Sequence, residues 1–160
     1  MSSQNEPLKC FPKGSCFFSA DVGRQKVCVC PCGSVANINK MDLDEITYKI
    51  NGAIFEVNRT LGAGFLEKVY ENALLIELKE RGLNAENQIP INVEYKDQKV
   101  GEYFADIVVE NQIIIEIKAI TSLGKVHEAQ ILNYLKATGM KIGLLVNFTH
   151  PKAEIKRFIL

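Results

Sequence analysis

The first regular pattern of apolar residues begins directly after Met41. There, Asp42 and Glu45 form a pair that resembles a capping box, in which two side chains satisfy free backbone groups at a helix start. Apolar side chains then recur every three or four residues, at Leu43, Ile46, Ile50, Ile54, Val57 and Leu61. Because this spacing puts them on one face of a helix, we predict an amphipathic helix over residues 43–61.

Two further stretches have the same helical period. The segment Gly62-Ala63-Gly64 interrupts the first helix, and a second helix is predicted over residues 65–81, before Gly82. Its apolar side would carry Leu66, Val69, Tyr70, Ala73, Leu74 and Leu78. A third helix is predicted over residues 125–138, closed by Gly139.

Four short apolar stretches predict β-strands. They cover residues 88–95, 100–109, 113–119 and 142–148. Pro90 suits a strand that begins there or lies at the edge of a sheet, and residues 96–99 form the predicted turn. We leave the last residues, 151–160, open between a helical turn and a further strand.

The predicted order of elements is α-α-β-β-β-α-β, which places the chain in the α/β class. Short turns join the first three strands, so these neighbours run antiparallel. The long helix over residues 125–138 is a crossover that makes the third and fourth strands parallel. We therefore expect a mixed four-stranded sheet flanked by helices, in one domain of residues 41–160.

Residues 1–40 differ from the rest, and we predict a mostly irregular N-terminal extension there. They contain all the cysteines of the chain, which are Cys10, Cys16, Cys28, Cys30 and Cys32. The last three could bind a soft metal, but their C-x-C-x-C spacing is not that of paired knuckles and no His lies nearby. Alternatively, residues 1–40 are upstream sequence translated from a mis-assigned start, and Met41 is the native first residue.

Composition and charge narrow the function classes. Net charge is zero, and residues 41–160 hold 14 Lys and Arg against 17 Asp and Glu, so nucleic-acid binding would need a local basic patch or a metal. A domain without cysteine suits a reducing cytoplasm, where we expect the protein to act. No apolar run is long enough for a membrane helix and no secretory pattern opens the chain, so we expect no membrane partner.

Charged residues interrupt the second and third predicted strands. Glu116 and Lys118 share one face of the third strand, because side chains alternate along a strand. Asp106, on the preceding strand, lies opposite Glu116 only if the connecting loop has an odd number of residues. We predict a three-residue loop, Glu110-Asn111-Gln112, that brings the two carboxylates together.

Two neighbouring carboxylates repel each other unless a cation lies between them. Mg²⁺ is the natural candidate because it prefers oxygen ligands and needs few of them from the protein. Lys118 could then hold a metal-bound water or offset phosphate charge. The alternative is that Asp106 and Glu116 form ordinary salt bridges with lysines at a sheet edge.

The set Asp106, Glu116 and Lys118 resembles the D…(E/D)-x-K signature of the PD-(D/E)XK nuclease superfamily. Ala105 stands where the superfamily's name has Pro, a position that often varies among relatives. The resemblance covers about residues 42–150 and leaves residues 1–40 outside.

Two further motifs carry the resemblance. Gly64-Phe65-Leu66-Glu67-Lys68-Val69-Tyr70 reads G-x-x-E-x-x-Y, which is similar to the GxxExxY proteins within that superfamily. Gln130 and Tyr134 match the Q-x-x-x-Y pattern of its next helix.

The resemblance implies a restriction-endonuclease-like core and a role for each motif residue. Asp106 and Glu116 would bind Mg²⁺, or Mn²⁺ in its place, and Glu67 would join them directly or through water. Lys118 would position or deprotonate the attacking water.

Gln130 and Tyr134 lie one turn apart on one helical face, as i and i+4. The resemblance implies that they orient Lys118 or contact the phosphate backbone.

Three functions follow from these patterns. The first is a Mg²⁺-dependent nuclease acting on DNA, or alternatively on RNA, with a homodimer or a partner subunit needed to grip and cut a duplex. The second is a nucleic-acid-binding or interaction module that keeps the fold without cutting. The third is a regulator that binds metal through the N-terminal cysteines, and only this one would be lost on deletion of residues 1–40.

Overall fold

The computed structural model describes residues 19–22, 25–29, 35–36, 41–149 and 151–160. It separates two compact units, Met1–Met41 and Asp42–Leu160. The first contains a small antiparallel sheet of β1 (Ser19–Val22), β2 (Gln25–Val29) and β3 (Val35–Ala36). The sequence pattern missed these strands because they are too short to show sustained alternation.

The candidate metal segment of the N-terminal extension falls largely outside the described residues. Cys30 and Cys32 are not among them, and neither are Cys10 and Cys16. The hypothesis of a soft-metal site there therefore stays a prediction.

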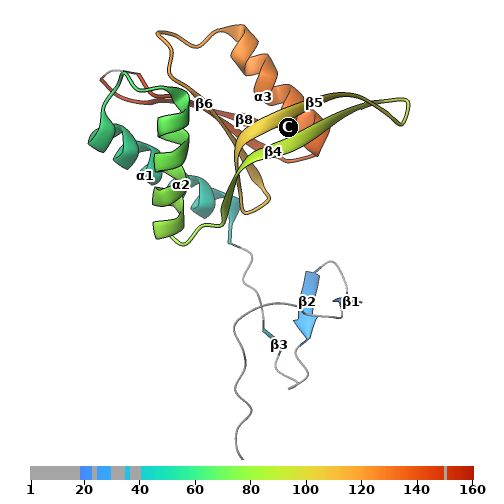
Figure 1. The fold of residues 1–160 in the computed structure, drawn as a ribbon. Helices are drawn as coiled ribbons and strands as arrows, with labels where there is room; N and C mark the ends of the chain where they lie inside the picture. Colours follow the sequence, from blue (N-terminus) through green and yellow to red (C-terminus); the bar gives the residue numbers. More distant parts are fainter. Residues whose placement is uncertain (1–18, 23–24, 30–34, 37–40, 150) are drawn as a thin grey trace, which may run out of the picture. The chain divides into compact units, whose positions relative to one another are not determined.

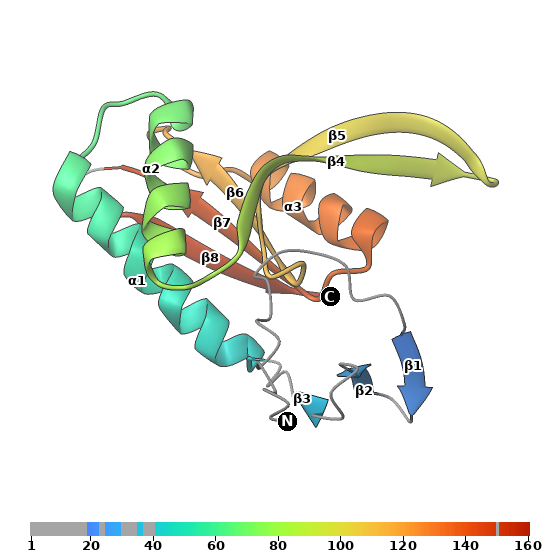
Figure 2. The same ribbon diagram turned by 60° about the horizontal axis from the view of Figure 1, so that its bottom comes forward.

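The unit Asp42–Leu160 is a five-stranded mixed sheet between helices (Figures 1 and 2). Helices α1 and α2 cover one face of the sheet, and α3 covers the other. The helices are α1 (Leu43–Leu61), α2 (Glu67–Glu80) and α3 (Lys125–Thr138). The strands are β4 (Ala85–Tyr95), β5 (Gln98–Val109), β6 (Ile113–Lys118), β7 (Ile142–Asn147) and β8 (Glu154–Ile159). None of the helices in the described ranges has the length and apolar character that spanning a membrane requires.

The sheet has the order β4-β5-β6-β7-β8. The predicted directions are confirmed: β4, β5 and β6 are antiparallel neighbours, and α3 makes β6 and β7 parallel. The count of four strands was wrong, because β8 pairs antiparallel with β7 and adds a fifth. Pro90 is tolerated inside β4 because β4 is an edge strand.

The turn between β4 and β5 is shorter than predicted. It consists of Lys96 and Asp97, both with positive φ (50° and 61°), rather than of residues 96–99. Positive φ at both central residues is typical of the two-residue turn whose twist matches a hairpin, so the strands continue to Tyr95 and Gln98.

Helix α1 has its predicted bounds, but its start lacks the predicted capping box. Asp42 occupies the N-cap position with no side-chain hydrogen bond, and only its carbonyl accepts the Ile46 amide, at 3.0 Å. Helix α2 begins at Glu67, two residues later than expected, because Leu66 has extended backbone angles. Leu66 is 79% exposed and Val69 is also exposed, so the apolar side of α2 is narrower than predicted.

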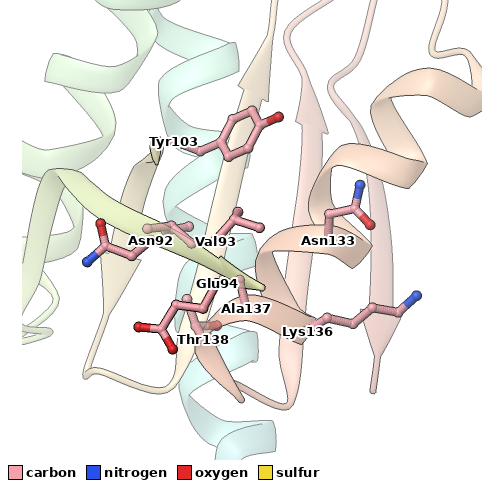
Figure 3. Close-up of a pocket in the computed structure, with 9 residues that line it drawn as sticks. Asn92, Val93, Glu94, Tyr103, Asn133, Lys136, Ala137 and Thr138 are labelled. Carbon is pink, nitrogen blue, oxygen red and sulfur yellow. The ribbon is translucent and has the colours of Figure 1, made fainter. Parts of the chain in front are cut away.

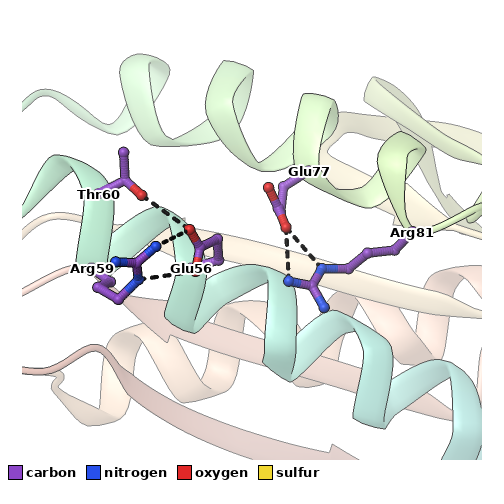
Figure 4. A network of polar contacts seen from close by, with 5 residues as sticks. All are labelled: Glu56, Arg59, Thr60, Glu77 and Arg81. Carbon is purple, nitrogen blue, oxygen red and sulfur yellow. Dashed lines mark hydrogen bonds and ion pairs between the residues drawn. The ribbon is translucent and has the colours of Figure 1, made fainter.

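Helices α1 and α2 pack against each other with ion pairs along their exposed sides (Figure 4). On α1, Arg59 donates two hydrogen bonds to Glu56, and Arg81, directly after α2, donates two to Glu77 of that helix. A side chain at Gly52 would place its Cβ 2.9 Å from Arg81 Nη1, so this glycine leaves room for the guanidinium. Since surface pairs contribute at most about 1 kcal/mol, the buried apolar faces hold the helices together.

Tyr70 joins α2 to the loop that precedes it. Its hydroxyl donates to the Gly62 carbonyl at 2.9 Å and accepts from the Phe65 amide at 3.2 Å. Its ring is fully buried and stacks on Phe148, with ring centroids 4.3 Å apart. The tyrosine of the G-x-x-E-x-x-Y motif is therefore a core residue that fixes the start of α2.

Helix α3 lies unusually close to β7. A Cβ added to Gly143 would be 2.7 Å from Cγ1 of Ile131 and 3.2 Å from Cδ1 of Leu135. Both side chains are buried. The absence of a side chain at Gly143 therefore sets the height of α3, and of Gln130 and Tyr134, above the sheet.

We predict that Gly143→Ala destabilises the protein by about 1–3 kcal/mol, the usual effect of forcing atoms into a packed core. Urea unfolding would measure the change. Gly101→Ala is the matched control, because a Cβ there meets nothing closer than 3.8 Å. Equal stability of the two variants would contradict the close packing of α3 on β7.

Candidate functional site

The loop between β5 and β6 has the predicted odd length. Its residues are 110–112, and Glu110 and Asn111 have positive φ. Strands β5 and β6 pair from Val109↔Ile113 to Ile107↔Ile115, and Asp106 and Glu116 are the residues that come directly after the last pair. The structure thus places the two carboxylates on neighbouring strands, as predicted.

The two charged residues of β6 lie on the sheet face that α3 covers. Ile114 belongs to a buried cluster with Tyr134 and Leu135 of α3. Because side chains alternate along a strand, Glu116 and Lys118 lie on the same face as Ile114.

Hydrogen bonds hold the three signature residues at the end of β6. The Ile117 amide donates to Asp106 Oδ2 at 2.8 Å, and Lys118 Nζ donates to Glu116 Oε1 at 2.8 Å. Glu116 is only 2% exposed. Its second oxygen, Oε2, is buried and accepts no hydrogen bond from any residue that the structure describes. A buried carboxylate oxygen without a partner is costly and requires an explanation.

The environment raises the pKa of both carboxyls. Burial raises the pKa of Glu116 to about 7, with a further contribution from the negative charge of Asp106 and opposition from Lys118. Burial also raises the pKa of Asp106, against the Ile117 hydrogen bond and the Lys118 charge. Burial alone would lower the pKa of Lys118, but its bond to Glu116 and the surrounding acids raise the pKa overall. Lys118 is therefore a cation at neutral pH.

These residues fit a divalent cation that prefers oxygen ligands. The unpartnered Oε2 of Glu116 and the carboxylate of Asp106 are hard oxygen ligands, and Mg²⁺ commonly takes one or two carboxylates and fills its other positions with water and phosphate. Within the described residues, no group of three or more His, Cys, Asp or Glu side chains is arranged to hold a metal. The ligands proposed from the sequence on β5 and β6, Asp106 and Glu116, are two carboxylates.

Glu67 reaches the same end of β6 from the first residue of α2. Its Oε1 accepts a hydrogen bond of 3.3 Å from the Ala119 amide, directly after Lys118. Its charge acts on Asp106, Glu116 and Lys118 alike. Direct metal binding by Glu67 stays a prediction, and contact through water is compatible with this position.

Glu71, one turn after Glu67, is an acidic residue that the sequence analysis missed. It is 4% exposed and accepts hydrogen bonds from Lys68 (2.6 Å), Asn87 (2.8 Å) and Gln88 (3.1 Å). Its charge contributes to the raised pKa of Asp106. The signal available in the sequence was the i, i+4 spacing from Glu67, which puts both carboxylates on one side of α2.

The side chains of Gln130 and Tyr134 form a hydrogen bond with each other. Gln130 Nε2 donates to the Tyr134 hydroxyl at 2.7 Å. Burial raises the pKa of Tyr134, and the charges of Glu116 and Asp106 raise it further. The structure shows no hydrogen bond from either residue to Lys118 among the contacts of the described residues, so the role of orienting Lys118 stays a prediction.

Asn147 is a second residue that the sequence analysis missed. It is fully buried at the end of β7, and its amide group both accepts from the Ile120 amide (3.0 Å) and donates to the Ile120 carbonyl (2.8 Å). The Phe148 amide also donates to the Lys118 carbonyl at 2.8 Å. These bonds fix the segment that follows β6, including the Ala119 amide that Glu67 contacts.

We predict that the metal-free protein loses stability as pH rises from about 4.5 to about 7. In that window the unfolded chain has lost the Glu116 proton and the folded chain retains it, so the free energy of unfolding falls by up to about 3 kcal/mol. The pKa of Asp106 is raised as well, so its titration also lowers the free energy of unfolding as pH rises. Urea unfolding at a series of pH values, with a chelator present, would measure the loss.

Glu116→Gln should flatten most of this pH dependence, because glutamine does not titrate. Glu80→Gln is the control at an exposed position of α2 and should keep the wild-type profile. A Glu116→Gln profile equal to that of the wild type would contradict the assignment.

Comparisons with known proteins bear on this geometry. A family model described as the PD-(D/E)XK nuclease superfamily matches residues 44–158. No curated protein matches the chain. Among solved structures, the chain is similar to the crystal structure of SSO0001, with a TM-score of 0.48 and 23% identity over 58% of this chain. That match spans 50% of the SSO0001 chain.

The helices and the mixed sheet of Asp42–Leu160 are consistent with the restriction-endonuclease-like core that the sequence predicted. The family match does not distinguish subgroups, so membership of the GxxExxY proteins stays a prediction.

Proposed function

This chain belongs to the PD-(D/E)XK nuclease superfamily, and we propose that it is a divalent-metal-dependent nuclease that hydrolyses phosphodiester bonds, with DNA as the expected substrate. The observation that carries the proposal is the buried, unpartnered Oε2 of Glu116, whose other oxygen accepts from the Lys118 ammonium and on which the charge of Asp106 acts. A core ion pair normally satisfies both oxygens of its carboxylate. A metal site needs such an oxygen.

The acids bind the cation, and Mg²⁺ or Mn²⁺ fits their chemistry. When bound, such a metal polarises the phosphate and lowers the pKa of a coordinated water, which is a sufficient account of phosphodiester cleavage. Glu116 and Asp106 hold the metal at the end of β6. Burial in the sheet keeps their charges poorly solvated, so that they gain strongly from a cation.

Lys118 serves as a fixed positive charge. Its ammonium donates to Glu116 Oε1 at 2.8 Å, and an ammonium has no lone pair with which to take a proton from water. It can donate a hydrogen bond to the attacking water and offset the charge that develops on the phosphate. This favours the positioning role over the role of general base.

Residues on the flanking helices complete the site. Glu67 fixes the backbone after β6 and adds negative charge toward the metal. Tyr134, with its hydroxyl bonded to Gln130, closes the α3 side. The implied interaction with nucleic acid follows from the family, and a dimer or partner subunit stays a proposal for cutting both strands of a duplex.

The competing proposal is a module that binds nucleic acid without cutting. It is favoured by the acidic excess of residues 41–160 and by the lack of a three-ligand metal cluster among the described residues. The two proposals differ in what the metal does, so one set of variants separates them.

We predict that the full chain binds Mn²⁺ and Mg²⁺ by calorimetry and cleaves labelled nucleic acid in their presence. Asp106→Asn and Glu116→Gln should lose metal binding and lower the cleavage rate by at least about 100-fold, since each removes a ligand of a two-carboxylate site. A panel of single- and double-stranded DNA and RNA would identify the substrate.

Glu86→Gln is the matched control, an exposed glutamate on β4 of the same sheet. It should keep wild-type metal binding and cleavage. Absence of metal binding in the wild type would contradict the nuclease proposal, and metal binding without cleavage of any substrate would favour the non-catalytic module.

A further inference from the structure

A groove lies between the β4–β5 hairpin and α3. Its volume is about 790 Å³, and Figure 3 shows side chains from both walls. A smaller hollow of about 280 Å³ adjoins it and shares Val93, Tyr103 and Asn133 among its lining residues. Together they form one path along α3, which we call the hairpin groove.

The hairpin groove extends to the two motif residues of α3. Gln130 and Tyr134 line its smaller part. Tyr134 packs in one buried cluster with Ile114 of β6, and Glu116 lies two residues further along the same face of that strand. A chain-like ligand that extends past Tyr134 would therefore reach the sheet face that carries Glu116.

The alternation of side chains between the two sheet faces is interrupted in β5, and this interruption turns the hairpin toward α3. Ala105 and Val108 both belong to the core cluster beneath Tyr134, although simple alternation would put them on opposite faces. The interruption occurs around Asp106, where Gln88 of the paired strand has a left-handed backbone (φ 54°). As a result Tyr103, beyond this point, lies against α3.

The lining has the chemistry of a stacking surface. The Tyr103 side chain is 53% exposed, and its ring lies 5.9 Å from that of Tyr134. Asn133 adds an amide, and Lys136 forms no ion pair with any residue that the structure describes. Glu94, on the hairpin wall, offsets this single positive charge.

We propose that the hairpin groove binds an unpaired strand of nucleic acid and directs it to the acids. The inference rests on the proposed function, and it assigns single-stranded nucleic acid as the substrate class. Aromatic rings can stack on bases of any sequence only when those bases are unpaired, because a duplex keeps its base faces inside.

The charges of the groove favour the same occupant. A duplex binder normally contacts many phosphates with Lys and Arg, and its affinity then falls steeply with salt. This groove offers Lys136 against Glu94, so stacking by Tyr103 must supply most of the affinity. The volume of about 790 Å³ suits a few nucleotides rather than a duplex.

The test is fluorescence anisotropy with the full chain and a labelled oligothymidylate of about 12 nucleotides, within the site sizes of about 4–16 that such grooves bind. A duplex of equal length is the comparison. A chelator prevents metal-dependent cleavage, so binding is measured apart from activity. We expect the single strand to bind at least about tenfold more tightly than the duplex, with a weak dependence on salt.

Tyr103→Ala should weaken single-strand binding about tenfold, the usual effect of removing one stacking ring, and Tyr103→Phe should restore it. Tyr95→Ala is the matched control, an exposed tyrosine of the same hairpin that does not line the groove. It should bind as the wild type does. Thermal unfolding would verify that each variant is folded.

Equal binding of single strand and duplex, no binding of either, or equal effects of Tyr103→Ala and Tyr95→Ala would overturn the proposal. These outcomes are distinct from failure of the nuclease function. Single-strand binding that depends on Tyr103, without cleavage on adding Mg²⁺ or Mn²⁺, would support the groove and reject the nuclease. Cleavage without a preference for single strands in binding would support the nuclease and reject the groove.

Discussion

The burial of Glu116 in the middle of a sheet is the constraint on which the rest of this structure depends. A carboxylate taken out of water needs partners for both oxygens, and Lys118 supplies only one. The neighbouring Asp106 increases the free-energy cost, because two negative charges then share a poorly solvated space. An arrangement that destabilises the metal-free protein is reasonable where a cation completes it, and this links the strained electrostatics to a binding role.

The surrounding elements hold this unfavourable pair in place. The close contact of α3 with Gly143 sets the height of Tyr134 above the sheet face that carries Glu116, and Tyr70 fixes the start of α2, from which Glu67 reaches the backbone after β6. Asn147 clamps the same backbone from β7. Rigid packing of this kind is what keeps like charges together when no ligand is bound, since a loose site would let them separate.

The helices, the sheet directions and the odd loop between β5 and β6 could be predicted, because each follows from local spacing: 3.6-residue periods, short turns and three loop residues. The features that were missed depend on contacts between distant segments. The spacing of Glu71 from Glu67 was visible in the sequence, but its burial depends on Asn87 and Gln88, which bond to it across the fold. Residues 151–160 stayed open between a helical turn and a strand, because only the pairing of β8 with β7 distinguishes the two. The turned hairpin that presents Tyr103 depends on the left-handed Gln88, which no sequence rule for glutamine anticipates.

The central claim is that the end of β6 is built to hold a divalent cation between Asp106 and Glu116. The most direct measurement is the NMR line broadening that paramagnetic Mn²⁺ causes in the backbone amide signals of the isotope-labelled full chain. Broadening centred on Ile117, Lys118 and Ala119, and absent in Glu116→Gln, is the result expected. Broadening that is absent from the wild type, or centred on exposed acids such as Glu94 and Glu102, would contradict it.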